Sequence, residues 1–555
     1  MKRCPVRPPL VCSLLVAIAC GGERGGELPC SSEWCGTLIM ASGGEPASLF
    51  PPEIGANVEA AANDFVFLPL AEIGPELNTV GDSGFAPRIA RTWAFEDSLT
   101  IRFDLDPRAR WHDGEPVTAN DVVYTFSVYR DTLVGSGVRS RLDPIDSVTA
   151  RDAGTAVFWF NRSYPEQFFD AVYHMRVLPH HLTASMPRAR LGDDPFWRAP
   201  VGNGPYRLVR WAGGEFMEFA ADSTFFLDRP GIPRLVWRFV TDLNTAIPQL
   251  LAGDVDFMNT VGPRENFRLL SEADHLRLIP YTSVVYTYVM LNTRDPQRPD
   301  RPHPLFGDRA LRRAVVAAVD AQAAVRTIFG ELGRVPPGPM TAVSSVWTED
   351  AGAIAFDSAL AANALDSLGW RDANGDGVRE RDGRPLRFEL LLPNTSSARH
   401  RAAVIVQEQL RRVGVAMEVT PLDFQTWSER SGAGRFDATF GAYGSDPSPV
   451  AIEEVWGRAG VESGDNWGHY TNPEVERWFT RAKTASHADT IAHAWREAVG
   501  LINADAPAIW IYTPMESMVI QRRFENVSIR PDQFGATIWQ WRVTPGAWIP
   551  RDTIR

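Results

Sequence analysis

One run of oxygen-bearing side chains in this sequence has the spacing of a calcium-binding loop. It reads Asp372-Ala-Asn-Gly-Asp-Gly377, with oxygen ligands at positions one, three and five and a glycine at position six. The twelfth position needs a bidentate glutamate but is Gly383, and no helix pair frames the run. A glycine-rich hairpin before Leu386 therefore explains the run better, and we predict no metal site and no cofactor.

The histidines and the potential nucleophiles of this sequence do not form a catalytic motif. The histidines worth considering are His112-Asp113, His180-His181, and His487 with His493. A separation of six residues does not place two imidazoles on one helical face, and neighbouring side chains in a turn usually point apart. The sequence has no Gly-x-Ser-x-Gly elbow and no His-Glu-x-x-His motif. We therefore predict no catalytic residue and no enzymatic activity.

The segment that positions His112-Asp113 reads as a strand followed by a tight turn. Apolar and polar residues alternate over 99–105, which predicts a strand with one buried face. Gly114 and Pro116 then supply turn chemistry. The residues expected on the buried face are Leu99, Ile101, Phe103 and Leu105.

A helix is predicted directly after this turn. Thr118 and Asp121 have the spacing of a capping box, in which side-chain oxygens accept from free backbone N–H groups. Val122, Phe126 and Tyr129 would form one apolar face of a helix that reaches Arg130.

Later segments indicate an α/β architecture. Residues 388–392, 400–413 and 415–419 read as strand, helix and strand, a unit whose two strands run parallel. Residues 249–256 read as a helix end capped by glycine before a strand. Residues 311–330 show helical spacing that stops at Gly330, which predicts one long helix.

Length and charge narrow the class of protein further. A chain of 555 residues with 44% hydrophobic residues is expected to form more than one lobe. Its formal net charge of -12 makes it a poor candidate for nucleic-acid binding. We see no internal repeat and no low-complexity tract.

The N-terminus has the form of a secretory signal. Basic residues precede an apolar run that ends at Ala19, so residues 1–19 are predicted to be a signal peptide. Ala17-Ile-Ala-Cys20, followed by a glycine-rich stretch, looks like a bacterial lipoprotein processing site. We predict acylation at Cys20, a tether over 20–35, and an exported chain held on the periplasmic or cell-surface side of a membrane.

The mature chain would keep one further pair of cysteines, Cys30 and Cys35. In an oxidising compartment a small disulfide loop is favoured over a metal site, because two thiolates cannot complete a tetrahedral zinc site.

The strand, turn and helix together resemble a known family. Trp93, Phe103-Asp-Leu105 and Trp111-His-Asp-Gly-Glu-Pro-Val-Thr-Ala-Asn-Asp-Val122 are similar to the motif of the extracellular solute-binding proteins of family 5, the peptide/nickel class. These receptors deliver oligopeptides, dipeptides, nickel chelates and some oligosaccharides to ABC importers. The resemblance implies a two-lobed periplasmic-binding-protein fold of type II, similar to the large cluster C proteins, with an extra subdomain in lobe I.

The resemblance also implies how the chain divides. Lobe I would comprise 36–280 and 515–555, with the extra subdomain at 53–198, and lobe II would comprise 281–514. Residues 284–292 and 508–512 resemble the two crossovers between the lobes. Both lobes would contribute to a cleft that closes on a solute.

The same resemblance implies a set of ligand-binding residues. Trp427 matches an aromatic that lines the peptide cleft, and Tyr443-Gly-Ser-Asp446 matches a segment whose carboxylate can pair with a peptide's α-ammonium. An Asx turn before Pro447 explains Asp446 equally well. Weaker candidates for lining the cleft are Arg435, Trp456, Asn466, Trp467 and Trp510.

These observations predict a monomeric, lipid-anchored substrate-binding protein that captures a peptide and passes it to the permease subunits of an ABC importer. Within the same fold, an oligosaccharide or a nickel chelate is the alternative solute. Two roles outside transport stay open: an exported hydrolase, for which no motif is found, and a chaperone-like role without a solute.

Overall fold

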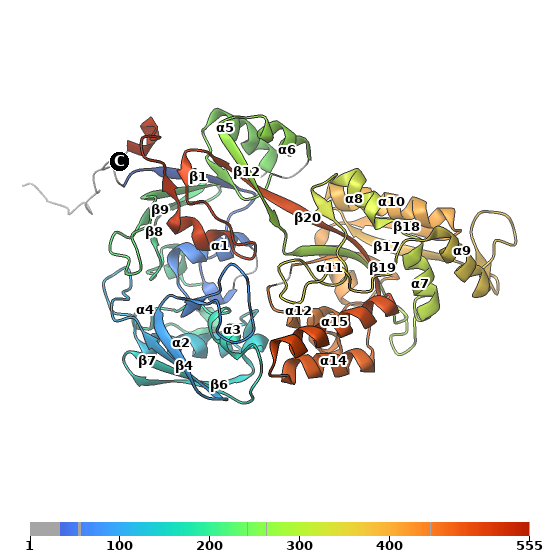
Figure 1. Ribbon diagram of the computed structural model, residues 1–555, viewed down its shortest axis with the longest axis horizontal. Coiled ribbons are helices and arrows are strands. Elements are labelled where there is room, and N and C mark those ends of the chain that lie inside the picture. The colour runs from blue at the N-terminus through green and yellow to red at the C-terminus, as the bar shows by residue number, and fades with distance from the viewer. Residues whose placement is uncertain (1–33, 54–56, 241, 262–263, 445, 554–555) are drawn as a thin grey trace, which may run out of the picture.

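Two lobes lie side by side in the computed structural model of the chain and are joined by long strands (Figure 1). The structure describes residues 34–553 except 54–56, 241, 262–263 and 445. Predictions for the signal peptide, Cys20 and Cys30 lie outside these residues. Among the described helices, none is both long and apolar enough to cross a membrane.

One sheet runs through both lobes. Among the described residues it contains twelve strands, ten of which follow one another in the order β18, β17, β19, β13, β20, β11, β1, β10, β9 and β8. Two further strands, β12 and the short β14, also pair with β20. The bounds are β18 (Ala416–Leu422), β17 (Arg387–Pro393), β19 (Ala438–Gly444), β13 (Val285–Leu291), β20 (Ala508–Gln521), β11 (Phe257–Met258), β1 (Thr37–Ser42), β10 (Arg234–Phe239), β9 (Phe216–Ala221), β8 (Tyr206–Ala212), β12 (Leu276–Thr282) and β14 (Gly333–Arg334).

The strand β20 connects the lobes. Its first part pairs with β13 in lobe II, where Val289 lies opposite Ile509. Its second part pairs with β12 in lobe I, where Leu278 lies opposite Val519. Because β12 leads directly into β13, the chain crosses between the lobes twice within one continuous sheet, once near 283–284 and once within β20.

The extra sheet of lobe I contains the strand predicted at 99–105. Its order is β4 (Ala90–Asp97), β5 (Thr100–Leu105), β7 (Thr155–Phe160) and β6 (Ile145–Asp152), all antiparallel. Ile101 and Phe103 are fully buried, as predicted. Leu99 is 40% exposed, so its predicted burial is wrong: it lies in the turn between β4 and β5, where side-chain alternation no longer sets the direction.

The predicted turn and helix are confirmed. Gly114 has a φ of 97°, a conformation that glycine adopts without strain. Helix α2 (Ala119–Arg130) begins with a capping box between Thr118 and Asp121, and its apolar face is buried. Short helices complete this part of lobe I: α1 (Asn57–Val66), η2 (Arg139–Leu142), α3 (Gln167–Val172) and α4 (His180–Thr183).

Lobe II contains the predicted strand, helix and strand. β17 and β18 pair in parallel, and α10 (Ser397–Arg412) connects them. The glycine-capped helix end is also confirmed, since α5 (Ile247–Ala252) ends at Gly253 in the left-handed conformation before β11 in lobe I. The single long helix predicted over 311–330 is wrong. Asp320 caps a second helix, so the segment divides into α7 (Arg309–Ala317) and α8 (Ala321–Ile328).

The sheet of lobe II is buried on both faces. Val289 and Leu291 belong to a core covered by α7, α8 and α10, whereas Tyr288 and Met290 belong to a core on the opposite face. Lobe I has its own large core around β1 and β10. The remaining helices are α6 (Arg264–Ser271) in lobe I and, in lobe II, α9 (Ser358–Ser367), α11 (Phe424–Gly432), α12 (Val450–Trp456), α13 (Arg458–Ser463), α14 (Pro473–Thr484) and α15 (Ala488–Asp505).

Candidate functional site

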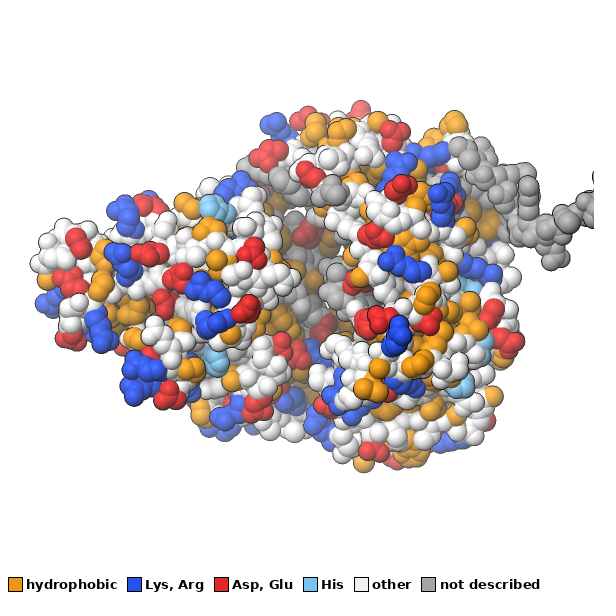
Figure 2. Space-filling model, turned by 180° about the vertical axis from the view of Figure 1, so that it is seen from behind, with side chains coloured by type: hydrophobic (Ala, Val, Ile, Leu, Met, Phe, Trp, Pro, Cys, Tyr) orange, Lys and Arg blue, Asp and Glu red, His pale blue; other side chains and the backbone are white. Residues whose placement is uncertain are grey.

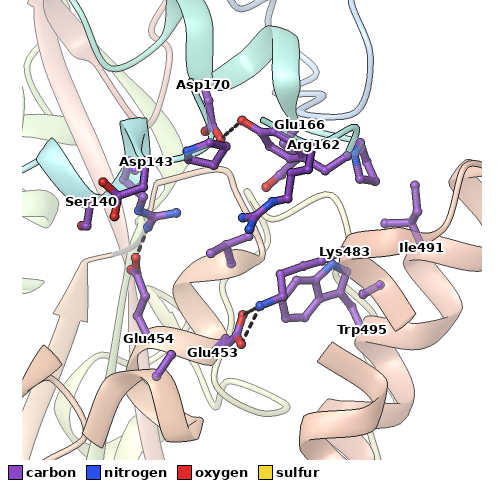
Figure 3. A pocket seen from close by; sticks show the side chains of 17 residues that line it. Ser140, Asp143, Arg162, Glu166, Asp170, Glu453, Glu454, Lys483, Ile491 and Trp495 are labelled. Carbon is purple, nitrogen blue, oxygen red and sulfur yellow. Dashed lines mark hydrogen bonds and ion pairs between the residues drawn. The ribbon is translucent and has the colours of Figure 1, made fainter. Parts of the chain in front are cut away.

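A pocket of about 330 Å³ lies where η2 and the segment around α3 in lobe I meet α12, α14 and α15 of lobe II (Figure 3). A hollow between the lobes is also visible from the other side of the molecule (Figure 2). Charged side chains from both lobes line the pocket. They are Arg141, Asp143, Arg162, Glu166 and Asp170 from lobe I, with Glu453, Glu454 and Lys483 from lobe II.

Short elements position these side chains at the contact between the lobes. Arg141 lies on η2, and Glu166 is the residue that precedes α3. Glu453 and Glu454 lie on α12, and Lys483 lies near the end of α14. The pocket therefore exists only while the two lobes are together.

An arginine of lobe I forms ion pairs with carboxylates of lobe II. Arg141 donates to Glu454 Oε2 at 2.7 Å, and its guanidinium lies 3.4 Å from Asp446 Oδ2. Burial alone would lower the pKa of Arg141, but the charges of Asp446 and Glu454 raise it above its ordinary value. Burial raises the pKa of Glu454 despite the opposing charge of Arg141. The two lobes thus share a partly buried charge cluster.

A second polar contact between the lobes is built on a buried carboxyl group. The Ser448 hydroxyl of lobe II donates to Glu166 Oε2 at 2.7 Å, and Glu166 is only 7% exposed. Burial raises the pKa of Glu166 to about 8, and the charge of Asp170 adds to the rise, while the Thr79 and Ser448 hydroxyls oppose it. The Glu166 carboxyl is therefore protonated at neutral pH in this environment.

The neighbouring carboxylate is held in place within lobe I. Tyr164 donates its hydroxyl to Asp170 Oδ2 at 2.7 Å, and His174 Nε2 lies 3.1 Å from Asp170 Oδ1. On the opposite wall, Lys483 pairs with both oxygens of Glu453 at 2.6 and 2.7 Å. Fixed polar groups in a concave, partly apolar pocket can bind a small polar solute, because these groups are already oriented before the solute arrives.

Comparison with known proteins identifies the family. The model of the bacterial extracellular solute-binding proteins, family 5 Middle, matches residues 84–453, more than half of the chain.

The chain belongs to this family.

Relatives and solved structures agree with that assignment. The chain is 24% identical to the oligopeptide-binding protein AppA of Bacillus subtilis over 455 residues, which cover 80% of this chain and 81% of AppA. It is 29% identical over 491 residues to protein XP55 of Streptomyces lividans, covering 88% and 85% of the two chains.

Two solved structures share the fold at 22% identity. The structure of Bacillus subtilis AppA in complex with a nonapeptide has a TM-score of 0.77, with 92% of this chain and all of that chain covered. The structure of NikZ from Campylobacter jejuni in complex with Ni(L-His) has a TM-score of 0.76, with 91% and 99% covered. The predicted family and the two-lobed α/β binding-protein fold are therefore confirmed.

Two of the residues predicted from the family resemblance lie beside the charge cluster. Asp446 pairs with Arg141 through one oxygen and accepts from the Ser448 backbone N–H at 2.9 Å through the other. The ion pair and the Asx turn therefore occur together. Tyr443, on β19, donates to Glu454 Oε2 at 3.3 Å.

Most of the predicted aromatic residues lie in the core of lobe II rather than on the wall of the pocket. Trp456 is fully buried and donates to the Tyr286 hydroxyl at 3.1 Å, and Trp510 donates to Asn503 Oδ1 at 2.8 Å. Trp427 is 6% exposed and packs edge-on against the half-buried Trp467. Their indole rings stabilise the lobe, as large aromatic side chains commonly do.

The two remaining predicted residues lie away from the pocket as well. Asn466 is buried, and its amide donates to the backbone oxygens of Gly457 and Tyr470. Arg435 is exposed and pairs with Glu429 at 2.8 Å. Cys35 is disulfide-bonded, and its predicted partner Cys30 lies outside the described residues.

The residues for which the sequence predicts no catalytic or metal-binding role form structural contacts. His112 Nε2 lies 3.0 Å from the Gly204 oxygen, whereas Asp113 contacts His181 Nε2 at 2.8 Å, so the two neighbours do point apart. The predicted hairpin is confirmed in the pairing of β15 (Glu380–Arg381) with β16 (Arg384–Pro385). Asp372 accepts from two backbone N–H groups within its own loop. Among the described residues, no cluster of three potential metal ligands occurs.

Sequence reasoning missed Arg141, Glu166, Glu454 and Lys483. The first three have no local signal, because their importance depends on two segments about 300 residues apart that meet in space. Lys483 could have been noticed, since it is the only lysine besides Lys2 in the sequence.

Proposed function

We propose that this protein is the substrate-binding component of an ABC importer and that it captures peptides between its two lobes. The observation that supports this most is the pocket at the contact between the lobes, whose polar groups come from both sides. Such an arrangement couples solute binding to lobe closure, because only the closed state offers all the contacts.

A peptide fits the chemistry of this pocket. It carries an ammonium group for a carboxylate such as Asp446, a carboxylate for a cation, and backbone groups that strands can bind. Several relatives carry names that describe peptide binding, and one solved neighbour holds a nonapeptide. The protein performs no chemistry in this proposal and passes the bound solute to permease subunits as a monomer.

The proposal includes export and a lipid anchor. The N-terminal pattern that ends at Cys20 supports acylation there, with the mature chain outside the cytoplasm. Mass spectrometry of the native N-terminus tests this part. A diacylated or triacylated Cys20 is expected, and an unmodified N-terminus at another residue contradicts it.

Calorimetry and thermal shift with three solute panels test the function. Peptides of two to nine residues are expected to bind and to raise the melting temperature, while maltooligosaccharides and a nickel–histidine chelate leave it unchanged. Stabilisation by a sugar or the chelate alone would move the protein to another solute class in the same fold. Cleavage products from peptide or glycoside panels would identify a hydrolase instead.

A further inference from the structure

Two carboxyl groups in the pocket form no ion pair with an arginine or a lysine among the described residues. Glu166 and Asp170 are one helical turn apart at the start of α3, a spacing that places two carboxyl groups on the same face. Within the described structure neither forms an ion pair with an arginine or a lysine. Asp170 contacts the imidazole of His174 at 3.1 Å. Two neighbouring acids therefore face the pocket without a permanent cation between them.

Glu166 has an unused hydrogen-bonding atom. Its Oε2 accepts from Ser448, but its Oε1 is buried and has no hydrogen-bond partner among the described residues. The Thr79 hydroxyl, which opposes the rise in the pKa of Glu166, is also buried but forms no close hydrogen bond. A buried polar atom without a partner costs roughly 1–3 kcal/mol. A binding site is one reason for a protein to keep such an atom beside a pocket.

Two of the three cations that line the pocket form ion pairs with other carboxylates. Arg141 pairs with Glu454 and Asp446, and Lys483 pairs with Glu453. Both of these cations are therefore neutralised on the lobe II side of the cleft. Arg162, the third cation that lines the pocket, lies over the ring of Tyr164 with its guanidinium carbon 5.6 Å from the ring centroid, and among the described residues it forms no ion pair with Glu166 or Asp170. A cation that pairs with these two acids would therefore come with the solute.

We propose that the pocket binds a basic side chain of the captured peptide, with its ammonium or guanidinium beside Glu166 and Asp170. This inference rests on the proposed peptide-binding function and adds a second cation subsite to the predicted amine contact at Asp446. The cavity of about 330 Å³ lies at the lower end of the range for small-molecule pockets, roughly 300–1,000 Å³, and it is large enough for a long side chain.

A bound ammonium group would lower the pKa of Glu166 and favour its ionised form, because a nearby opposite charge stabilises the carboxylate. The two carboxylates and the ammonium group would then be shielded from solvent by both lobes. Charge-assisted hydrogen bonds are stronger there than at an exposed surface. A neutral side chain of the same shape would leave Glu166 Oε1 without a partner. The subsite should therefore select peptides by the charge of this side chain rather than by its length.

Matched peptides test the subsite without any mutation. Tripeptides and pentapeptides of alanine that carry one lysine, placed at each position in turn, are compared by calorimetry with peptides that carry norleucine instead. Norleucine keeps the aliphatic chain and lacks the ammonium. At least one lysine peptide is expected to bind the wild-type protein about tenfold more tightly than its norleucine counterpart.

A variant then assigns the preference to Glu166. Glu166→Gln keeps the length of the side chain and an oxygen that can accept from Ser448, and it should reduce the lysine preference to within about twofold. Glu418→Gln is the matched control, because Glu418 is exposed and pairs only with Arg387 within lobe II. It should keep the full preference.

The outcomes separate this inference from the proposed function. If lysine and norleucine peptides bind the wild-type protein equally, peptide capture stands and the cation subsite is refuted. If Glu166→Gln keeps the full lysine preference, the subsite at Glu166 is also refuted. If no peptide of either series binds, the proposed function fails together with the subsite.

Discussion

Replacing Arg141 with alanine tests whether charge holds the two lobes together. Its side chain is 15% exposed, and those of Glu454 and Asp446 are 27% and 20% exposed, so all three are largely shielded. Exposed ion pairs contribute roughly 0–1 kcal/mol, whereas removing one partner of a buried pair costs roughly 2–5 kcal/mol. Because the burial of this cluster lies between that of an exposed pair and that of a fully buried pair, we expect Arg141→Ala to weaken the contact between the lobes by about 2 kcal/mol.

That change would shift the equilibrium of the solute-free protein about 30-fold toward separated lobes. Fluorescent labels at Leu133 of lobe I and Val404 of lobe II, which are 65% and 46% exposed, would report the distance between the lobes in single-molecule measurements. Arg387→Ala, which removes an exposed ion pair inside lobe II, is the control and should leave the distances unchanged. If Arg141→Ala also left them unchanged, the reasoning would be refuted.

Three further predictions concern the amine contact, the buried carboxyl group and the core. Asp446→Ala should weaken binding of peptides with a free amino terminus by about 2 kcal/mol or more. Calorimetry with acetylated counterparts is the control, and equal losses in both sets would argue against an amine anchor. Burial keeps Glu166 protonated in the folded protein up to a pKa of about 8, against an ordinary value of 4.5, so the folded state binds more protons between these values. Stability should therefore fall as pH rises through this window, and Glu166→Gln should remove that part of the decline in melting temperature; parallel curves for variant and wild type would contradict this. Trp456→Ala should cost about 3–5 kcal/mol in urea unfolding, because a large buried ring and its hydrogen bond to Tyr286 are lost, and unchanged stability would be inconsistent with its place in the core.

Local signals in the sequence were enough to predict individual elements. The strand at 99–105, the turn at Gly114 and the capped helix after Thr118 each depend on residues within a few positions of one another. The parallel pair of β17 and β18 followed from the same kind of pattern. Such elements can be predicted because caps and turns depend on hydrogen bonds between residues close in sequence, and strands show an alternation of apolar and polar residues.

Two errors show where local patterns mislead. Helical spacing continues from 311 to 330, but Asp320 accepts from the Ala323 N–H and starts a new helix, so periodicity concealed a break that capping chemistry could have indicated. Leu99 follows the alternation of the strand but lies in a turn, where its side chain faces solvent.

The candidate site was harder to predict, because it depends on contacts between distant segments. The family resemblance implied that Trp427, Trp456 and Trp510 line the cleft, yet these rings pack in the core of lobe II. Of the predicted set, only Tyr443 and Asp446 reach the charge cluster. Tyr443 donates to Glu454, and Asp446 pairs with Arg141, which lies about 300 residues earlier. No spacing rule within one segment can identify such a partner.

Native mass spectrometry of the protein purified without refolding tests the central claim most directly. A receptor that closes on its solute often retains it, since opening is required for release. The account predicts a bound mass that is released on denaturation and sequenced as a peptide, with a lysine or arginine in its sequence. A released sugar or metal chelate, or a protein that stays empty and gains no stability from any peptide, would contradict it.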